Sequence, residues 1–119
     1  TIHNMVERAL SDVRGQWILH PHTQAESELQ LSVKMNDQCE RLVIDRTFID
    51  ENGTRWIIDY KTAATEEENL QIFLAQQKEQ YQAQMDKYMY AMQQLESRPI
   101  KMGLYFPAIT AWCEWENNH

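Results

Sequence analysis

The hydrophobic and polar positions near the start of the chain repeat at helical spacing. Apolar residues recur every three to four positions over about 2–12, which predicts a short amphipathic helix. Arg14 and Gly15 are expected to end it, before Trp17-Ile18-Leu19 enters the core. The segment 20–22, His-Pro-His, is predicted to be a loop, because a residue before proline is pushed out of helical geometry.

The period changes to two at Glu26 and predicts three successive strands. Apolar and polar residues alternate over about 26–34, which is typical of a half-buried strand. Further strands are expected over about 39–49 and 54–61. The Asp-Glu-Asn-Gly segment at 50–53 lies between these two and is a strong signal for a hairpin.

A long amphipathic helix is predicted next, starting at Thr65, which forms a capping-box pattern with Glu68. Its apolar period continues to Ser-Arg-Pro at 97–99. A fourth strand is expected over 100–106 and a fifth over 111–115. Since a helical crossover separates the third and fourth strands, the fourth is expected to be parallel to an inner strand. The order of elements indicates an α+β fold.

Three ionisable residues interrupt the apolar runs of the second and third strands. Asp45 follows Leu-Val-Ile, Asp59 follows Trp-Ile-Ile, and Lys61 comes two residues later. Burying charge is costly unless something pairs with it. The alternative is that these residues are solvated charges on an exposed sheet face, but their apolar flanks favour strands covered on both sides. We therefore interpret them as a divalent-metal site with a basic partner, which suits phosphodiester hydrolysis.

The register of the hairpin decides whether the two carboxylates meet. A two-residue loop would set Asp45 across from Tyr60, with its carboxylate pointing away from Asp59. A three-residue loop with a left-handed Gly53 would place Asp45 opposite Asp59, with Cβ atoms about 5 Å apart. Carboxylates that close repel unless a cation neutralises both. We predict the three-residue loop, or an equivalent bulge.

Gln80, Gln84 and Tyr88 follow one another at four-residue intervals, so they form one stripe of the long helix. In a functional interpretation, Gln84 and Tyr88 face the carboxylates and hold lysine, water or phosphate. In the simpler interpretation they are a solvated glutamine beside a core tyrosine. Spacing alone favours the simpler one.

Composition limits what else the chain can be. Its 119 residues are enough for one domain, and no apolar run is long enough to span a membrane. The chain starts without methionine, so we expect a fragment or processed product. The two cysteines are far apart and are expected to be reduced thiols. A net charge of −7 argues against a freestanding nucleic-acid binder, so any DNA substrate is expected to be delivered by something else.

Several segments together resemble the PD-(D/E)xK nuclease superfamily. The likeness is closest to the C-terminal nuclease domain of RecB/AddA-type helicase-nucleases (exodeoxyribonuclease V beta-like), carried by bacterial UvrD/Rep-family helicases. It spans about 26–107 and rests on these segments in order: Glu28-Leu29, Val43-Ile44-Asp45-Arg46, Trp56-Ile57-Ile58-Asp59-Tyr60-Lys61-Thr62, Tyr81-Gln82-Ala83-Gln84-Met85-Asp86-Lys87-Tyr88, and Leu104-Tyr105-Phe106-Pro107.

The resemblance implies a restriction-endonuclease-like αβββαβ core over 26–119, a mixed sheet with the long helix packed on it. Residues 1–25 would be an N-terminal helix and loop, remnant of a larger chain. It also implies Mg²⁺ or Mn²⁺ held by Asp45, Asp59 and the backbone carbonyl of Tyr60. Lys61 would position or deprotonate the attacking water and offset charge on the phosphate.

The resemblance assigns further residues with less direct roles. Gln84 and Tyr88 match a Gln-x-x-x-Tyr helix motif of the site, while Glu28 and Arg46 are expected to support the ligands without touching the ion. The family also carries a histidine or glutamate ligand on an upstream helix. The chain is expected to start after that ligand, and His3 is not carried over to it.

The function implied is that of a metal-dependent exonuclease domain in DNA repair and recombination. It would cleave single strands fed by a helicase motor, using a metal-activated water, in the bacterial cytoplasm. The rest of the helicase chain and a partner subunit are the expected partners, and no membrane is involved. The alternative is a catalytically inactive domain of the same fold with a structural or DNA-guiding role.

Overall fold

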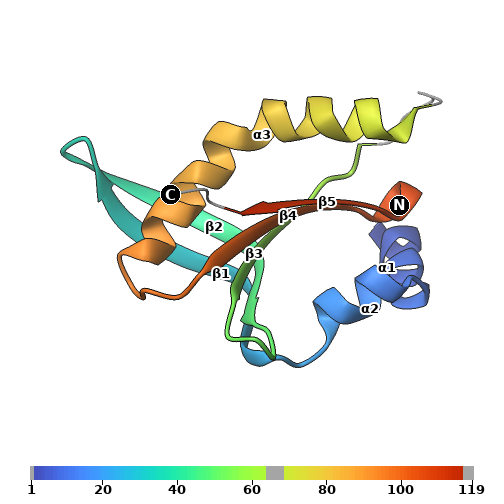
Figure 1. Ribbon diagram of the computed structural model, residues 1–119, viewed down its shortest axis with the longest axis horizontal. Helices are drawn as coiled ribbons and strands as arrows, with labels where there is room; N and C mark the ends of the chain where they lie inside the picture. The colour runs from blue at the N-terminus through green and yellow to red at the C-terminus, as the bar shows by residue number, and fades with distance from the viewer. Residues whose placement is uncertain (1, 64–68, 117–119) are drawn as a thin grey trace.

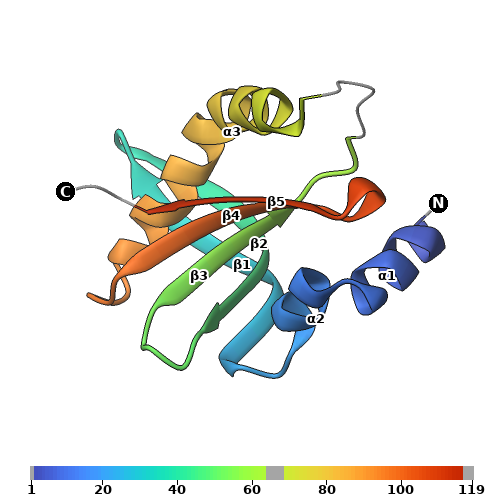
Figure 2. The same ribbon diagram turned by 45° about the vertical axis from the view of Figure 1, so that its right-hand side comes forward.

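A computed structural model describes residues 2–63 and 69–116, with side chains described from residue 7 onward. One five-stranded sheet lies between helices on its two faces (Figures 1 and 2). The strands are β1 (Thr23–Met35), β2 (Gln38–Ile49), β3 (Arg55–Tyr60), β4 (Ile100–Phe106) and β5 (Ala111–Glu116). The helices are α1 (Ile2–Ser11), α2 (Val13–Leu19), α3 (Leu70–Gln93) and the short 3₁₀ turn η1 (Pro107–Ile109).

The strands lie side by side in chain order, β1-β2-β3-β4-β5. Three pairs are antiparallel, while β3 and β4 are parallel and joined through α3. The predicted parallel pair is therefore confirmed, because a helix between two strands brings the chain back to its starting end. The α+β class and the mixed sheet are confirmed as well, and the predicted strand boundaries differ from the observed ones by at most three residues.

The N-terminal segment differs from the prediction, because it forms two helices where one was expected. Asp12 begins α2, its Oδ2 accepting a hydrogen bond from Gly15 N at 3.1 Å. Gly15 does not end a helix. It lies inside α2, where a Cβ atom would meet the carbonyl oxygen of Ala9 at 2.1 Å. The glycine thus marks the close approach of α1 and α2.

Helix α3 begins after Asn69, whose Oδ1 accepts hydrogen bonds from Gln71 N at 3.0 Å and Ile72 N at 3.3 Å. The predicted start at Thr65 and its capping box lie outside the described residues. Among the helices described, none has the combination of length and apolar character needed to cross a bilayer.

Two hydrophobic clusters fill the spaces on either side of the sheet. The larger lies between the sheet and α3 and includes Ile44, Ile57, Met85, Met102 and Leu104. The smaller lies between the sheet and the N-terminal helices and includes Ala9, Ile18, Phe48, Trp56, Ile58 and Tyr105. Because β3 contributes side chains to both clusters, it is a central strand of a three-layer domain.

Candidate active site

The turn between β2 and β3 has three residues, as predicted. Asp50 N donates to Thr54 O at 2.9 Å, and Gly53 N donates to Asp50 O at 3.0 Å. Gly53 has φ of +80°, the left-handed conformation that glycine adopts at no steric cost. The register that follows pairs Arg46 with Ile58, and one more step along both strands places Asp45 opposite Asp59.

The two strands separate directly beyond the Arg46–Ile58 pair, which is the last in their ladder. Tyr60 N donates instead to the side chain of Asp45, with 2.8 Å between the nitrogen and Oδ2. The Asp45 carboxylate therefore satisfies a backbone donor that a continuing strand would have paired. It is fixed at the point where β2 and β3 part.

Strand β2 also changes face at this point. Ile44 packs in the cluster under α3, whereas Phe48 packs on the opposite side, although both have even numbers and would share a face of a regular strand. On the neighbouring strand, the register places Glu28 across from Asp45, and Glu28 has φ of +54°. Glu28 is exposed. The irregular backbone thus coincides with the site.

Asp59 is 4% exposed and forms an ion pair with Lys61 through its Oδ2 atom. That oxygen accepts no hydrogen bond of acceptable geometry, so the ion pair is its main compensation. Burial, and then the neighbouring Asp45 carboxylate, raise the pKa of Asp59 while Lys61 lowers it, and the net result is a pKa of about 6. The two carboxylates are therefore close enough to repel each other strongly.

Lys61 is surrounded by groups from β3 and α3. Its Nζ donates to Gln84 Oε1 at 3.2 Å and lies 3.7 Å from the centre of the Tyr81 ring. Its backbone N donates to Tyr105 O at 2.9 Å, which ties the end of β3 to β4. The ammonium is thus held beside Asp59 by one amide and one aromatic face.

Gln84 and Tyr88 are joined on the face of α3 that looks toward the carboxylates. Gln84 Nε2 donates to the Tyr88 hydroxyl at 2.8 Å. Burial raises the pKa of Tyr88, and the negative charges of Asp59 and Asp45 add to this shift. Gln84 is exposed, as the simpler interpretation expected, but it also bonds Lys61, so the stripe belongs to the same cluster.

Arg46, which the resemblance assigns to the support of the metal ligands, directs its guanidinium to backbone and hydroxyl groups of α2, the following loop and β1. Its guanidinium donates to Ile18 O, His20 O and Ser27 Oγ, each at 3.0 Å. These partners lie on the α2 side of the sheet, opposite α3. Arg46 therefore fastens the end of α2 to β1 and β2.

The ring of His22, in the loop between α2 and β1, packs against the aromatic cluster on the α2 side of the sheet. The His22 ring stacks on Phe48 with 4.0 Å between centroids, and its Nε2 lies 2.6 Å from Trp17 O.

Tyr81 is the site residue that the sequence motifs did not assign. Its spacing indicates that it shares a helix face with Gln84 and Tyr88, because positions 81, 84 and 88 are three and four residues apart. The contact of its ring with Lys61, however, depends on where β3 ends relative to α3, which spacing does not reveal.

The paired carboxylates fit a hard divalent cation. Oxygen ligands suit Mg²⁺ and Mn²⁺. A shared cation would also relieve the repulsion that raises the pKa of Asp59 and would give a second partner to its Oδ2, which accepts no hydrogen bond. In the described part of the chain, no three side chains of His, Cys, Asp or Glu gather closely enough to hold an ion. Two carboxylates are therefore what the described residues supply.

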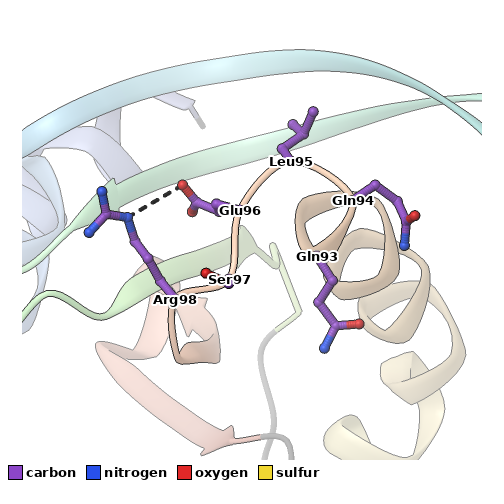
Figure 3. A pocket seen from close by; sticks show the side chains of 6 residues that line it. All are labelled: Gln93, Gln94, Leu95, Glu96, Ser97 and Arg98. Atoms are coloured by element: carbon purple, nitrogen blue, oxygen red, sulfur yellow. Dashed lines mark ion pairs between the residues drawn. The ribbon is translucent and has the colours of Figure 1, made fainter.

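The pocket in Figure 3 is separate from this site. It has a volume of about 570 Å³ and lies where α3 gives way to β4, while Asp59 lies across from Leu104 near the other end of β4. Within it, Arg98 Nε is 3.4 Å from Glu96, which also pairs with the buried Arg55 at 2.5 Å. Its lining residues are Gln93, Gln94, Leu95, Glu96, Ser97 and Arg98.

Comparison with known proteins identifies the family. The model of the PD-(D/E)XK nuclease superfamily matches residues 3–112. No curated protein matches the chain. Among solved structures, one described as the crystal structure of SSO0001 is similar, with 14% sequence identity and a TM-score of 0.48. The similarity covers 87% of this chain and 48% of that one, so the chain spans about half its length. On the family match, this chain belongs to the PD-(D/E)XK nuclease superfamily.

Proposed function

We propose that this domain hydrolyses DNA phosphodiester bonds as the exonuclease part of a helicase-nuclease. The observation that carries the proposal is the pair of opposed carboxylates, Asp45 and Asp59, with the Lys61 ammonium against one of them. Members of the superfamily are usually nucleases and generally use divalent metals. The helicase motor, the partner subunit, the role in DNA repair and recombination, and the bacterial cytoplasm come from the sequence resemblance.

In this proposal, Asp45, Asp59 and the backbone carbonyl of Tyr60 hold Mg²⁺ or Mn²⁺. When bound, the ion lowers the pKa of a water molecule and neutralises charge on the phosphate. Asp45 is kept in place by its hydrogen bond from Tyr60 N, so one carboxylate is oriented before any ligand arrives. The protein contribution is thus mainly a fixed geometry of negative oxygens.

Lys61 supplies the positive charge on the protein side. Its ammonium is within reach of Asp59, Gln84 and the Tyr81 ring, so its position is defined from three directions. From there it donates a hydrogen bond to the attacking water or to a phosphate oxygen. Gln84 and Tyr88 hold Lys61 from the helix side.

The second candidate is an inactive domain of the same fold that guides DNA or supports a helicase. Two observations favour it: the chain carries a net charge of −7, and the described residues provide two acidic ligands where a third protein ligand is expected. Against it stands the intact set of Asp45, Asp59 and Lys61.

The test is cleavage of labelled single-stranded DNA with Mn²⁺ or Mg²⁺, comparing the wild type with Lys61→Ala. We expect the variant to lose at least about 100-fold in rate, the range for a group that acts in the transition state. Lys34→Ala, which removes an equal charge from an exposed position on β1, is expected to cleave normally.

Thermal unfolding checks that both variants remain folded. Cleavage by Lys61→Ala at the wild-type rate would contradict the role given to this lysine. A wild type that binds Mn²⁺ or DNA without cleaving would support the inactive domain.

A further inference from the structure

A groove leads away from the site where β2 leaves β3. It has a volume of about 440 Å³, with β2 on one side and α3 on the other. The β2 wall precedes Arg46, the first residue along this strand that pairs with β3. Its walls include Glu40, Arg41 and Val43 from β2 and Gln84, Lys87 and Tyr88 from α3.

The groove is continuous with the candidate site. Gln84 and Tyr88 line it and at the same time bond to each other beside Lys61. A chain lying along the groove would therefore reach the carboxylates at the end where Gln84 stands. A neighbouring hollow on the β1–β2 hairpin shares Arg41, Leu42 and Val43 with the groove.

The charge of the groove differs from that of the whole chain. The molecule carries a net charge of −7, yet the α3 wall presents the Lys87 ammonium, with one carboxylate, Glu40, on the opposite wall. Lys87 Nζ lies 3.2 Å from Glu40, and its side chain is half exposed. An exposed ion pair of this kind contributes little to stability and is easily exchanged for another anion.

We propose that this groove holds the sugar-phosphate backbone of the DNA strand being cut, with Lys87 binding a phosphate next to the scissile one. The inference rests on the proposed function and adds to it the path of the strand. A groove of this volume is comparable to a small-molecule pocket, so it takes one strand rather than a duplex. Lys87 exchanges Glu40 for a phosphate when the strand enters.

The experiment measures binding of short labelled oligo(dT) by fluorescence anisotropy, in EDTA so that no cleavage occurs, over a series of salt concentrations. Lys87→Ala is expected to weaken binding roughly fivefold and to reduce the slope of log K against log salt by about 0.7, the loss of one phosphate contact on a single strand.

Arg98→Ala is the matched control. Arg98 is also a half-exposed cation paired with one glutamate, but it lies in the pocket of Figure 3, away from the site. Arg98→Ala removes the same charge as Lys87→Ala, so an effect of net charge alone on DNA binding would appear equally in both variants.

Glu40→Gln provides a second test, in which the affinity for oligo(dT) is expected to change in the opposite direction. It frees Lys87 without removing a cation, so binding is expected to tighten. If Lys87→Ala and Arg98→Ala weaken oligo(dT) binding equally, with the same loss of salt dependence, the proposed strand path is wrong. If Lys87→Ala does not fold, unchanged binding by Glu40→Gln would overturn it instead.

The two proposals fail in different ways. If the wild type cleaves DNA but Lys87→Ala behaves like Arg98→Ala, the nuclease remains and the groove is wrong. If Lys87→Ala weakens binding as expected but the wild type never cleaves, the strand path remains and the catalytic function is wrong.

Discussion

At Asp59, burial and the neighbouring Asp45 carboxylate both raise the pKa, which reaches about 6 from its ordinary value of 3.8. Lys61 opposes this rise but does not cancel it. Without a metal ion, the folded state therefore holds a proton on Asp59 over a pH range in which the unfolded chain has released it. The site is destabilised when both carboxylates are ionised, and a cation would reverse this.

This linkage predicts a specific pH dependence of stability. Because the folded state binds more protons than the unfolded state between about pH 4 and 6, the contribution of Asp59 to the unfolding free energy falls as pH rises through that window. Asp59→Asn, which does not titrate, lacks this contribution. Urea unfolding in EDTA at several pH values measures the difference between the two proteins.

A difference between wild type and Asp59→Asn that stays constant from pH 4 to 6 would contradict the raised pKa. Added Mn²⁺ gives a further check, because metal ligands must be deprotonated. We expect Mn²⁺ to stabilise the wild type more at pH 7 than at pH 5.

The residues of the site differ in how far the sequence could define them. Charged residues inside apolar strands identify Asp45, Asp59 and Lys61, since burial of an unpaired charge is costly. The contacts of Tyr81 and Arg46 could not be predicted from the sequence. The ring of Tyr81 reaches Lys61, and Arg46 points to α2, only because of how a helix and a strand end are placed in space.

Among the elements, the β2–β3 hairpin was predictable because its turn chemistry is local. Three loop residues with Gly53 in the left-handed conformation set the register, and the register sets which side chains face each other. The change of face at Asp45 was not predictable. The alternation of side chains assumes a regular strand, whereas the two halves of β2 pack on opposite faces of the sheet, under α3 and under the N-terminal helices.

The N-terminal helices raise the question of a third metal ligand. Helix α1 packs against η1, with Arg8 donating to Ala108 O, and η1 directly follows β4, whose Tyr105 O accepts from Lys61 N. The family match begins at His3, in the first turn of α1, although the side chain of His3 lies outside the described part of the structure. The resemblance places a histidine or glutamate ligand on an upstream helix.

Because the resemblance does not carry His3 over to that ligand, we expect His3→Ala to bind Mn²⁺ as tightly as the wild type. His20→Ala is the control, since His20 is an exposed loop residue. Calorimetric titration with Mn²⁺ compares the two. A weaker affinity in His3→Ala than in His20→Ala would show that His3 is a ligand, and equal affinity in both variants and the wild type would show that it is not.

On the scale of the whole molecule, the site lies where the sheet divides. The N-terminal half of β2 continues with β1 beneath α3, while β3 turns away with β4 and β5 (Figures 1 and 2). The carboxylates stand at the division and the groove runs from it. The net charge of −7 opposes attraction of DNA by this domain alone, and in the proposed function a helicase motor delivers the strand.

The central claim is that Asp45 and Asp59 share one divalent ion. Calorimetric Mn²⁺ titration of the wild type, Asp45→Asn, Asp59→Asn and Asp37→Asn tests it most directly. Asp37→Asn is the control, because it removes the same charge from an exposed turn residue. We predict one site in the wild type and in Asp37→Asn, and its loss in each of the other two variants. Mn²⁺ binding that survives unchanged in both Asp45→Asn and Asp59→Asn, or is lacking in the folded wild type, would contradict the claim.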